Sequence, residues 1–415
     1  MDYAVKDIKL AAAGRMQLEW AESQMGALLE VRKRFAKEKP LKGQKVGMAL
    51  HVTKETGALV RTLIAGGAQV SIAGCNPLST QDDTAAALAE EGVRVFAKKG
   101  ETKEEYYEYI NKVLDMNPTA TIDDGLDLVS LIHTKRPELL KDLLVGTEET
   151  TTGVNRLRAM AKDGALKYPV IAVNDNKTKH LFDNYYGTGQ STLDGILRAT
   201  NILFAGKNVV VIGYGDCGKG VAQRASGFGS NVIVCEVDPL KGLQAKMDGY
   251  TVLPFEETLA NGDVFITVTG NKHAIPASAF PKMKSGAILA NSGHFDIEID
   301  VAGLESLAKS KRRIRWQLDE YTLAGGKKIY LCAEGRLVNL GAAEGHPSTV
   351  MSLSFCGQAL ALEYGIRNDL EHGLHVLPDS VDRDIAILQL KAMGIRIDSL
   401  TTEQQNYMNS WDEGT

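Results

Sequence analysis

Two stretches of this chain alternate short apolar runs with amphipathic segments, and this alternation limits the possible folds more than any other feature. In the first stretch we predict buried strands at 45–50, 69–74, 93–97 and 120–123, with helices near 55–65, 80–91, 103–114 and 136–144. An amphipathic helix over 15–35 precedes them. Strands that alternate with helices are joined by helical crossovers, so they lie parallel in a sheet covered on both faces.

The second stretch repeats the pattern, with strands at 208–213, 231–237, 263–269 and 286–291 and helices near 218–228, 239–249 and 276–283. The length of 415 residues exceeds the ~250–300 residues at which a single core stops growing. We therefore predict an α/β protein with two doubly wound parallel-sheet domains.

Helical patterns at 348–366 and 380–393 follow the second sheet and must pack somewhere. We expect the chain to return to its first domain, which is then discontinuous. The predicted units are residues 1–184 with 347–378, residues 185–346, and a helical C-terminal segment over 379–415.

Charge and composition exclude several classes of protein. The 47 basic and 52 acidic residues give a net charge of −5, which argues against a nucleic-acid binder or a polybasic membrane anchor. No apolar run approaches the ~20 residues that span a bilayer. The five cysteines are scattered without a C-x-x-C, which is typical of reduced thiols in a cytoplasm. The one H-x-x-H, at 372–375, has no third ligand nearby, so we expect no metal site.

A G-x-G-x-x-G motif at 213–218 directly follows a predicted strand and opens a predicted helix. Gly213 permits the tight turn, Gly215 lets the backbone approach a pyrophosphate, and Gly218 lets the helix lie close to the strand. Glu236 ends the next strand, 23 positions after Gly213, where an acid holds the ribose 2′-hydroxyl and repels a 2′-phosphate. A glycine-rich turn followed by an unrelated acid is the alternative, but strand, turn, helix and acid together favour an NAD site.

Polar residues follow three of the four strands in the first half. His51, Thr53 and Glu55 follow the first strand, residues 76–83 the second, and Asp123 to Gly125 the fourth. Each group has a simpler explanation as a helix N-cap or a turn. Because loops beyond the carboxyl ends of parallel strands line the ligand crevice, their joint occurrence at one sheet edge favours a binding site.

Further polar residues lie between and beyond these loops. Residues 148–153, with sequence EETTTG, form a poor helix start and an unusual loop. Lys179 and Asp183 at i, i+4 form either a surface ion pair or a lysine held by an acid as proton acceptor for a hydroxyl. Ser292, Gly293 and His294 follow a strand beside the predicted nicotinamide end, and His346 lies at the second crossover between the domains.

Together these motifs resemble the S-adenosyl-L-homocysteine hydrolase family, from about residue 41 to His346. The matching segments are CNPLSTQD at 75–82, DDGLDL at 123–128, LIHTK at 131–135, EETTTG at 148–153, KHLFDN at 179–184, GYGDCGKG at 213–220, SGHFDIEID at 292–300 and AEGRLVNLGAAEGHPS at 333–348. Ordinary dehydrogenases share only the glycine loop, so the set is highly specific.

The resemblance implies reversible hydrolysis of S-adenosyl-L-homocysteine to adenosine and L-homocysteine. In this family tightly bound NAD oxidises the 3′-hydroxyl transiently, and elimination, water addition and re-reduction follow. The catalytic residues that the resemblance implies are His51, Asp124, Glu149, Lys179, Asp183 and His294. The implied substrate contacts are Thr53, Glu55, Asp124, Glu149, Lys179, Asp183 and His346.

Among these, Lys179 with Asp183 matches the base for the 3′-hydroxyl, while Thr53 and Glu55 match positions beside the adenine. The glycine motif and the resemblance together imply these cofactor contacts: Thr150, Thr151, Thr152, Asn184, Gly213, Gly215, Asp216, Cys217, Gly218, Lys219, Gly220, Glu236, Ser292, Gly293, His294, Asn339 and His346. The first domain is thus the predicted substrate-binding domain, and the second is a Rossmann domain for NAD.

The chain also departs from the pattern of the family. Many relatives have His, Cys and Asn where this sequence has Asp83, Thr188 and Lys241. The Thr188 change removes the thiol expected beside the nicotinamide. The family's final Lys and Tyr, which reach the NAD of a neighbouring subunit, have no match, as in short archaeal or thermophilic members. The resemblance implies a homotetramer.

Three other functions remain possible on the same residues. An S-inosyl-L-homocysteine hydrolase would carry a different base, whereas Thr53 and Glu55 can accept a hydrogen bond from the exocyclic amine of adenine. A plain NAD-dependent oxidoreductase would show net hydride transfer. A silent NAD-binding regulator would be free to lose His51 and Lys179, which are both present.

Overall fold

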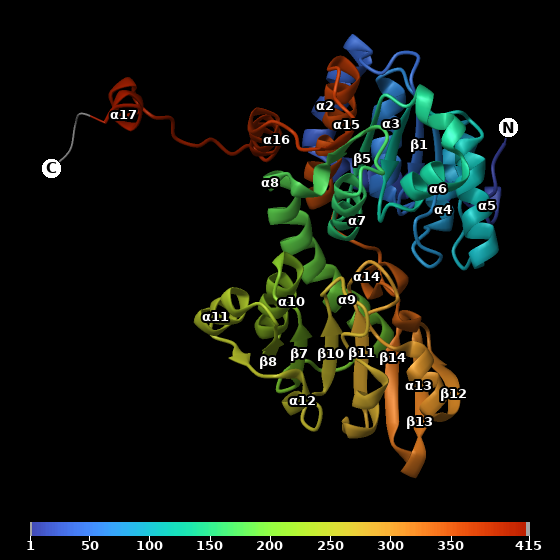
Figure 1. The fold of residues 1–415 in the computed structure, drawn as a ribbon, viewed down its shortest axis with the longest axis vertical. Coiled ribbons are helices and arrows are strands. Elements are labelled where there is room, and N and C mark those ends of the chain that lie inside the picture. Colours follow the sequence, from blue (N-terminus) through green and yellow to red (C-terminus); the bar gives the residue numbers. More distant parts are fainter. Residues whose placement is uncertain (1, 412–415) are drawn as a thin grey trace.

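Seven parallel strands form the sheet of the first lobe in the computed structural model, which describes residues 2–411 (Figure 1). Their order is β15 (Gly373–His375), β6 (Pro169–Ala172), β5 (Val145–Glu148), β4 (Ala120–Asp123), β1 (Lys45–Ala49), β2 (Gln69–Ala73) and β3 (Arg94–Phe96). The chain passes from β1 outward to β3 and then returns to the other side of β1. The loops after β1 and β4 therefore flank a topological switch point, where ligands bind in sheets of this kind.

Helices cover both faces of this sheet. One face packs on α1 (Ala11–Gln24), α2 (Gly26–Glu38), α3 (Lys54–Ala65), α4 (Asp82–Glu90) and α15 (Ser348–Arg367). The other packs on α5 (Lys103–Leu114), α6 (Asp127–Lys135) and α7 (Thr151–Lys162). The predicted helix over 15–35 is two helices, because the backbone turns at the fully buried Met25. The prediction of a helix at 136–144 is wrong, since Pro137–Asp142 forms only 3₁₀ turns before β5.

Eight strands form the second sheet. Their order is β12 (Ala308–Arg315), β13 (Leu318–Leu323), β14 (Lys328–Cys332), β11 (Ala287–Asn291), β10 (Val264–Thr267), β7 (Asn208–Ile212), β8 (Asn231–Cys235) and β9 (Thr251–Val252). The prediction of parallel strands holds from β14 to β9 but not at the edge, where β12, β13 and β14 are antiparallel. A largely exposed, arginine-rich edge strand such as β12 lacks the apolar run of a buried one.

The helices of the second lobe are α9 (Thr188–Thr200), α10 (Asp216–Gly227), α11 (Pro239–Met247), α12 (Phe255–Thr258), α13 (Val301–Leu307) and α14 (Val338–Gly341). The predicted helix at 276–283 is a 3₁₀ segment, Ala277–Lys282, that contains Pro281. Here β10 returns to the other side of β7, so the loop after β7 lies at the second switch point.

Two crossovers join the lobes. The first runs through α8 (Lys177–Lys179) and the π-helical turns of His180–Gly187, and the second leads into α15. Beyond β15, α16 (Asp379–Ala392) packs on α2 and α15, whereas α17 (Thr402–Met408) stands away from both lobes (Figure 1). Within residues 2–411, no helix is both long and apolar enough to cross a membrane. The predicted chain end at 412–415 lies outside the described residues.

Candidate active site

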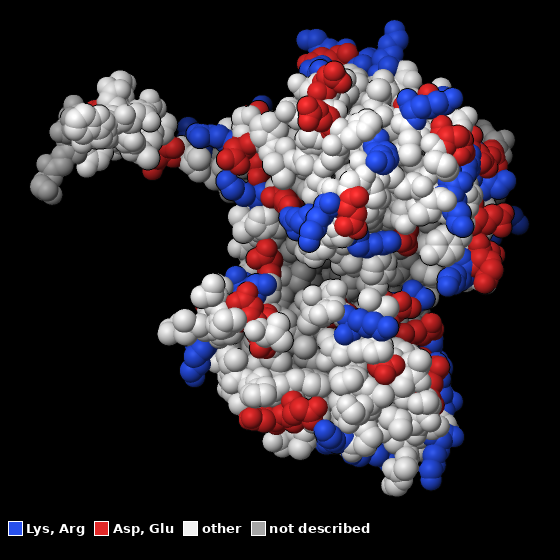
Figure 2. All heavy atoms as spheres, in the orientation of Figure 1, with Lys and Arg blue, Asp and Glu red and all other residues white. Residues whose placement is uncertain are grey.

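A cavity of about 1070 Å³ lies between the two lobes, where the carboxyl ends of both sheets face each other. Figure 2 shows a hollow there and charges of both signs interspersed over that face of the molecule. Almost all the residues predicted from the sequence line this cavity: His51, Thr53, Glu55, Asp124, Glu149, Thr150, Thr151, Thr152, Lys179, Asp183, Asn184, Gly213, Gly215, Asp216, Cys217, Lys219, Glu236, Ser292, Gly293, His294, Asn339 and His346.

Gly218 and Gly220 do not line the cavity, so their contact with the cofactor stays a prediction. A Cβ on Gly218 would lie 2.0 Å from the carbonyl oxygen of Gly213, and one on Gly220 would lie 1.9 Å from that of Tyr185. Both glycines therefore allow the close packing of α10.

The loop after β7 has the form that a dinucleotide requires. Gly213 has φ +105°, a backbone conformation that residues other than glycine rarely adopt. A Cβ on Gly215 would meet no atom within 4 Å, so the backbone at the start of α10 borders open space. Glu236 at the end of β8 accepts the backbone N–H of Tyr214 at 2.6 Å, which fixes its carboxylate beside the loop.

Two buried polar atoms on the cavity wall have no hydrogen-bond partner within residues 2–411. They are Asn339 Oδ1 and His346 Nδ1. Buried polar atoms are normally paired, so atoms left open on a cavity wall indicate a ligand that supplies the missing partner. These atoms and the glycine loop fit the expected NAD.

Lys179 lies in a cluster of buried polar groups on the first crossover. Its Nζ donates to Asn184 Oδ1 at 2.9 Å and Asp183 Oδ1 at 3.3 Å, and lies 3.8 Å from Glu149 Oε1. Burial lowers the pKa of Lys179, but the charges of Asp183 and Glu149 outweigh burial, so the pKa is raised overall. The surface ion pair considered from the sequence is excluded, because both side chains are buried.

Glu149 is held in place by the return of the chain to the first lobe. It accepts hydrogen bonds from Ser354 and Gln358, both on α15 and fully buried. Burial raises the pKa of Glu149 to about 7, although the charge of Lys179 opposes this. The Lys179 cluster therefore contains a carboxyl group that can take up or release a proton near neutral pH.

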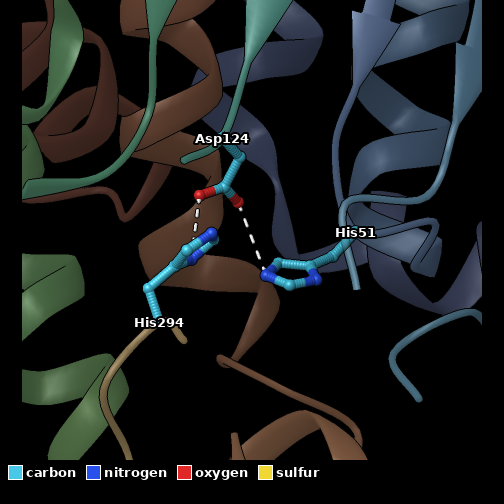
Figure 3. A group of neighbouring side chains, drawn as sticks. All are labelled: His51, Asp124 and His294. Atoms are coloured by element: carbon cyan, nitrogen blue, oxygen red, sulfur yellow. Dashed lines mark ion pairs between the residues drawn. The ribbon is translucent and has the colours of Figure 1, made fainter. Parts of the chain in front are cut away.

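His51, Asp124 and His294 form a second cluster, drawn from both lobes (Figure 3). The Asp124 carboxylate lies 3.5 Å from His51 Nε2 through one oxygen and 3.5 Å from His294 Nδ1 through the other. Burial lowers the pKa of His51 to about 4, so this imidazole is neutral at physiological pH. A neutral imidazole beside a carboxylate is suited to proton transfer.

Glu55 lies in the first turn of α3 and is 2% exposed. Its Oε1 accepts from Ser348 Oγ at 2.6 Å, while its Oε2 accepts no hydrogen bond from the residues that the structure describes. Thr53 caps α3, as the simpler explanation held, and also lines the cavity. This end of the cavity presents oxygen acceptors to a ligand.

Several lining residues were not among the predicted contacts. Glu344, Met351 and Phe355 lie on or just before α15, and their positions follow from the return of the chain rather than from a motif. Thr188 and Lys241, noted as departures, also line the cavity. Cys217 Sγ lies 3.6 Å from Thr188 Oγ1, so a thiol is present beside the departure after all.

Glu148 connects two loops of the site, and its pKa provides a test of the electrostatics of the site. Its Oε1 accepts the backbone N–H groups of Gly125 at 2.9 Å and Thr150 at 3.0 Å, joining the loops that carry Asp124 and Glu149. Burial and the neighbouring Asp123 raise the pKa of Glu148 well above its usual range. Because the folded-state pKa is raised, the stability that its proton supports is lost as pH rises.

Glu148→Gln, which keeps the accepting oxygen without the charge, should therefore be at least as stable as the wild type, with an advantage that grows from pH 5 to pH 9. Glu148→Ala should cost about 1–3 kcal/mol for each amide that it orphans. Urea unfolding at both pH values measures these effects. A Gln variant that loses stability relative to wild type at pH 9 would show that the carboxyl is ionised there.

Comparison with known proteins gives two family matches and many full-length relatives. Residues 2–146 match the model described as S-adenosyl-L-homocysteine hydrolase, and residues 184–345 match its NAD binding domain. An adenosylhomocysteinase of Aquifex aeolicus is 56% identical, and one of Sulfurisphaera tokodaii is 57% identical. An S-inosyl-L-homocysteine hydrolase of Methanocaldococcus jannaschii is also 57% identical. Each alignment covers 100% of this chain and 100% of the relative.

Proposed function

This chain belongs to the S-adenosyl-L-homocysteine hydrolase family, and on that basis we propose that it hydrolyses S-adenosyl-L-homocysteine reversibly to adenosine and L-homocysteine. Residues 184–345 are its NAD-binding domain, so NAD is the cofactor. The observation that carries the proposal is the meeting of the glycine loop with the Lys179 and His51 clusters in one cavity.

The residues suited to hold NAD are those of the second switch point and the opposite loops. The Gly213 to Gly215 loop and the start of α10 would hold the pyrophosphate, and Glu236 would hold a ribose hydroxyl. Thr150 to Thr152 and Asn339 reach the same cavity from other elements. When bound, NAD supplies the transient oxidation of the 3′-hydroxyl and its later reversal.

The Lys179 cluster is proposed to handle the proton of that hydroxyl. The cluster holds two carboxyl groups, Asp183 and Glu149, against one ammonium, so it has room for one more proton. The raised pKa of Lys179 changes its expected role as the base. As an ammonium it donates a hydrogen bond to the 3′-oxygen, while the proton passes to a carboxyl of the cluster.

The other cluster is proposed to handle protons at C4′ and C5′. A ketone at C3′ acidifies the C4′ hydrogen, and the thioether at C5′ then leaves. His51 is neutral and Asp124 lies beside it, so together they offer a proton acceptor where the elimination and the water addition require one. His294 brings the second lobe against this position and limits access of bulk water.

A direct experiment is incubation of the purified protein with S-adenosyl-L-homocysteine and a thiol reagent, without added NAD. Thiol release by the protein as purified is the expected result. A plain oxidoreductase would instead accumulate NADH, and a silent regulator would do neither. No thiol release even after NAD is added would refute the hydrolase.

The identity of the nucleobase in the substrate is the main open choice, because relatives named for adenosine and for inosine are equally similar. The free Oε2 of Glu55 favours adenine, since it can accept from an exocyclic amine but would face the carbonyl oxygen of hypoxanthine.

Glu55→Gln should weaken the adenosine substrate about tenfold or more in KM and affect the inosine substrate less, because the Gln amide can donate to the hypoxanthine oxygen. Steady-state kinetics with both thioethers measures the ratio. Glu344→Gln is the matched control, since Glu344 lines the same cavity but pairs with Lys54 at 2.9 Å. Equal losses for both substrates in the Glu55 variant would contradict the assignment.

A homotetramer in the cytoplasm is a further proposal. The five cysteines are all free, which suits a reducing compartment. The arm that carries α17 exposes Tyr407, Met408 and Trp411, side chains that a second copy of the chain could cover. Light scattering of the full chain and of a form ending at Ala392 gives the number of subunits in each assembly. Equal numbers of subunits would exclude a role for the arm.

A further inference from the structure

The first crossover between the lobes is held at its start by a residue from far along the chain. Asp382 lies on α16, and one oxygen of its carboxylate accepts the backbone N–H of Lys177 at 2.5 Å. The other oxygen accepts the backbone N–H of Thr178 at 2.9 Å and also the Thr178 hydroxyl hydrogen. Lys179 is the next residue, so these bonds fix the backbone immediately before the lysine of the Lys179 cluster.

The Asp382 carboxylate takes the place of a missing helix cap. α8 begins at Lys177, and the first N–H groups of a helix have no partner within the helix. The side chain of the preceding residue often accepts them, but Asn176 makes no such hydrogen bond. Asp382 accepts the N–H of Lys177 instead, from 205 positions away. This cap ties α8 to α16, which packs against it (Figure 1).

The position of Asp382 on α16 indicates that its carboxylate has a specific role. The buried residues of α16 are Asp382, Ile385 and Gln389, which lie on one face of the helix. A carboxylate on a buried face is costly unless hydrogen bonds compensate it, so an apolar side chain would be the ordinary choice. Asp382 is 7% exposed and does not line the cavity. Its influence on the reaction must therefore pass through the residues that it holds.

Lys179 depends on its backbone for the accuracy of its contacts. Its long side chain can adopt many rotamers unless both ends are fixed. At one end, Nζ donates to Asn184 Oδ1 at 2.9 Å and to Asp183 Oδ1 at 3.3 Å. At the other, the backbone N–H donates to the carbonyl oxygen of Asn176 at 3.0 Å, within the turn that Asp382 caps. A misplacement of about 1 Å can cost about 10²-fold in rate.

We propose that Asp382 is a positioning residue for the reaction, which holds Lys179 at the 3′-hydroxyl of the substrate through the cap of α8. This inference rests on the proposed function, because that function assigns Lys179 to the hydroxyl proton. The residues suited to the base, such as Glu55 on α3, take no part in these bonds. Asp382 should therefore affect the chemistry of the 3′-hydroxyl more than the binding of the nucleoside.

Replacement of Asp382 by Ala separates chemistry from binding. We expect the rate at which adenosine reduces the bound cofactor to fall at least ~10-fold, while the KM for S-adenosyl-L-homocysteine changes less than about threefold. Asp379→Asn is the matched control, because Asp379 lies on the same helix but is exposed and pairs with Lys177 Nζ at 3.3 Å. The control should reduce its cofactor at the wild-type rate. A wild-type rate in Asp382→Ala would overturn the proposal.

A double variant tests whether Asp382 acts through Lys179. If it does, Asp382→Ala should slow cofactor reduction no further in the Lys179→Met background, because effects carried by one group do not multiply. A general loss of structure would act independently of the lysine and lower the rate by the same factor in both backgrounds. Equal factors would therefore refute the positioning role.

Hydrogen exchange of the NAD-loaded protein tests the cap without any substrate. In Asp382→Asn an amide group replaces one accepting oxygen, so the amides of Lys177 and Thr178 should exchange at least ~10-fold faster than in the wild type. Mass spectrometry of the peptide that spans them measures this exchange, which should be unchanged in Asp379→Asn. Wild-type exchange in Asp382→Asn would contradict the cap.

The isosteric Asp382→Asn also keeps the kinetic test available if the alanine variant does not fold, and it should likewise slow cofactor reduction without a matching change in KM. If the wild type releases no thiol, the proposed function fails and the positioning role fails with it. The hydrogen exchange result still decides whether Asp382 caps α8.

Discussion

Lys179→Met should lower the rate of thiol release from S-adenosyl-L-homocysteine by about 10²–10⁴-fold. Methionine fills a similar volume but removes the ammonium that lies 3.3 Å from Asp183 and 3.8 Å from Glu149. Without that charge the pKa of Glu149 rises further and the 3′-oxygen loses its donor, so the first oxidation should fail. The fraction of bound cofactor that is reduced after adding adenosine measures this step directly.

The matched control for this prediction is Lys177→Met. Lys177 lies on the same short helix but is exposed and pairs with Asp379 at 3.3 Å outside the cavity. The Lys177→Met variant should release thiol at nearly the wild-type rate. A Lys179→Met rate within tenfold of wild type would show that the cluster does not handle the hydroxyl proton.

Asp124→Asn should also cost at least ~10²-fold in thiol release, but at a different step. The amide keeps the shape of the side chain and removes the charge between His51 and His294. The Lys179 cluster stays intact, so adenosine should still reduce the bound cofactor while elimination and water addition stall. Rapid absorbance measurements of reduced cofactor, compared with thiol release, separate the two steps.

Asp127→Asn is the control, since Asp127 is near in sequence but pairs with Arg156 at 3.0 Å. It should show neither effect. If Asp124→Asn lost cofactor reduction as fully as thiol release, the residue would serve the structure of the cavity rather than the later proton transfers.

The loops that carry His51 and Asp124 could be predicted because local patterns reveal strands, and polar residues stand where those strands end. The glycine motif could be found for the same reason, since Gly213 and Glu236 mark a turn and the end of the next strand. Short or polar strands were missed. Four residues at Val145–Glu148 carry too little periodicity, and β12 is charged along most of its length.

The partners of Glu149 could not be predicted from any motif. Ser354 and Gln358 are 205 and 209 positions away and reach it only because α15 returns to the first lobe. The proposed role of Lys179 as a hydrogen-bond donor also rests on distances to Asp183 and Glu149 that the sequence does not contain.

The sequence by itself determined the α/β class, the NAD motif and the family resemblance, because these depend on local periodicity and on residues close together in the chain. The tertiary structure alone decided that His51, Asp124 and His294 share one point. The spacing of the histidines along the chain does not show this meeting. Their meeting depends on the contact between two separately folded lobes, and no local pattern encodes that contact.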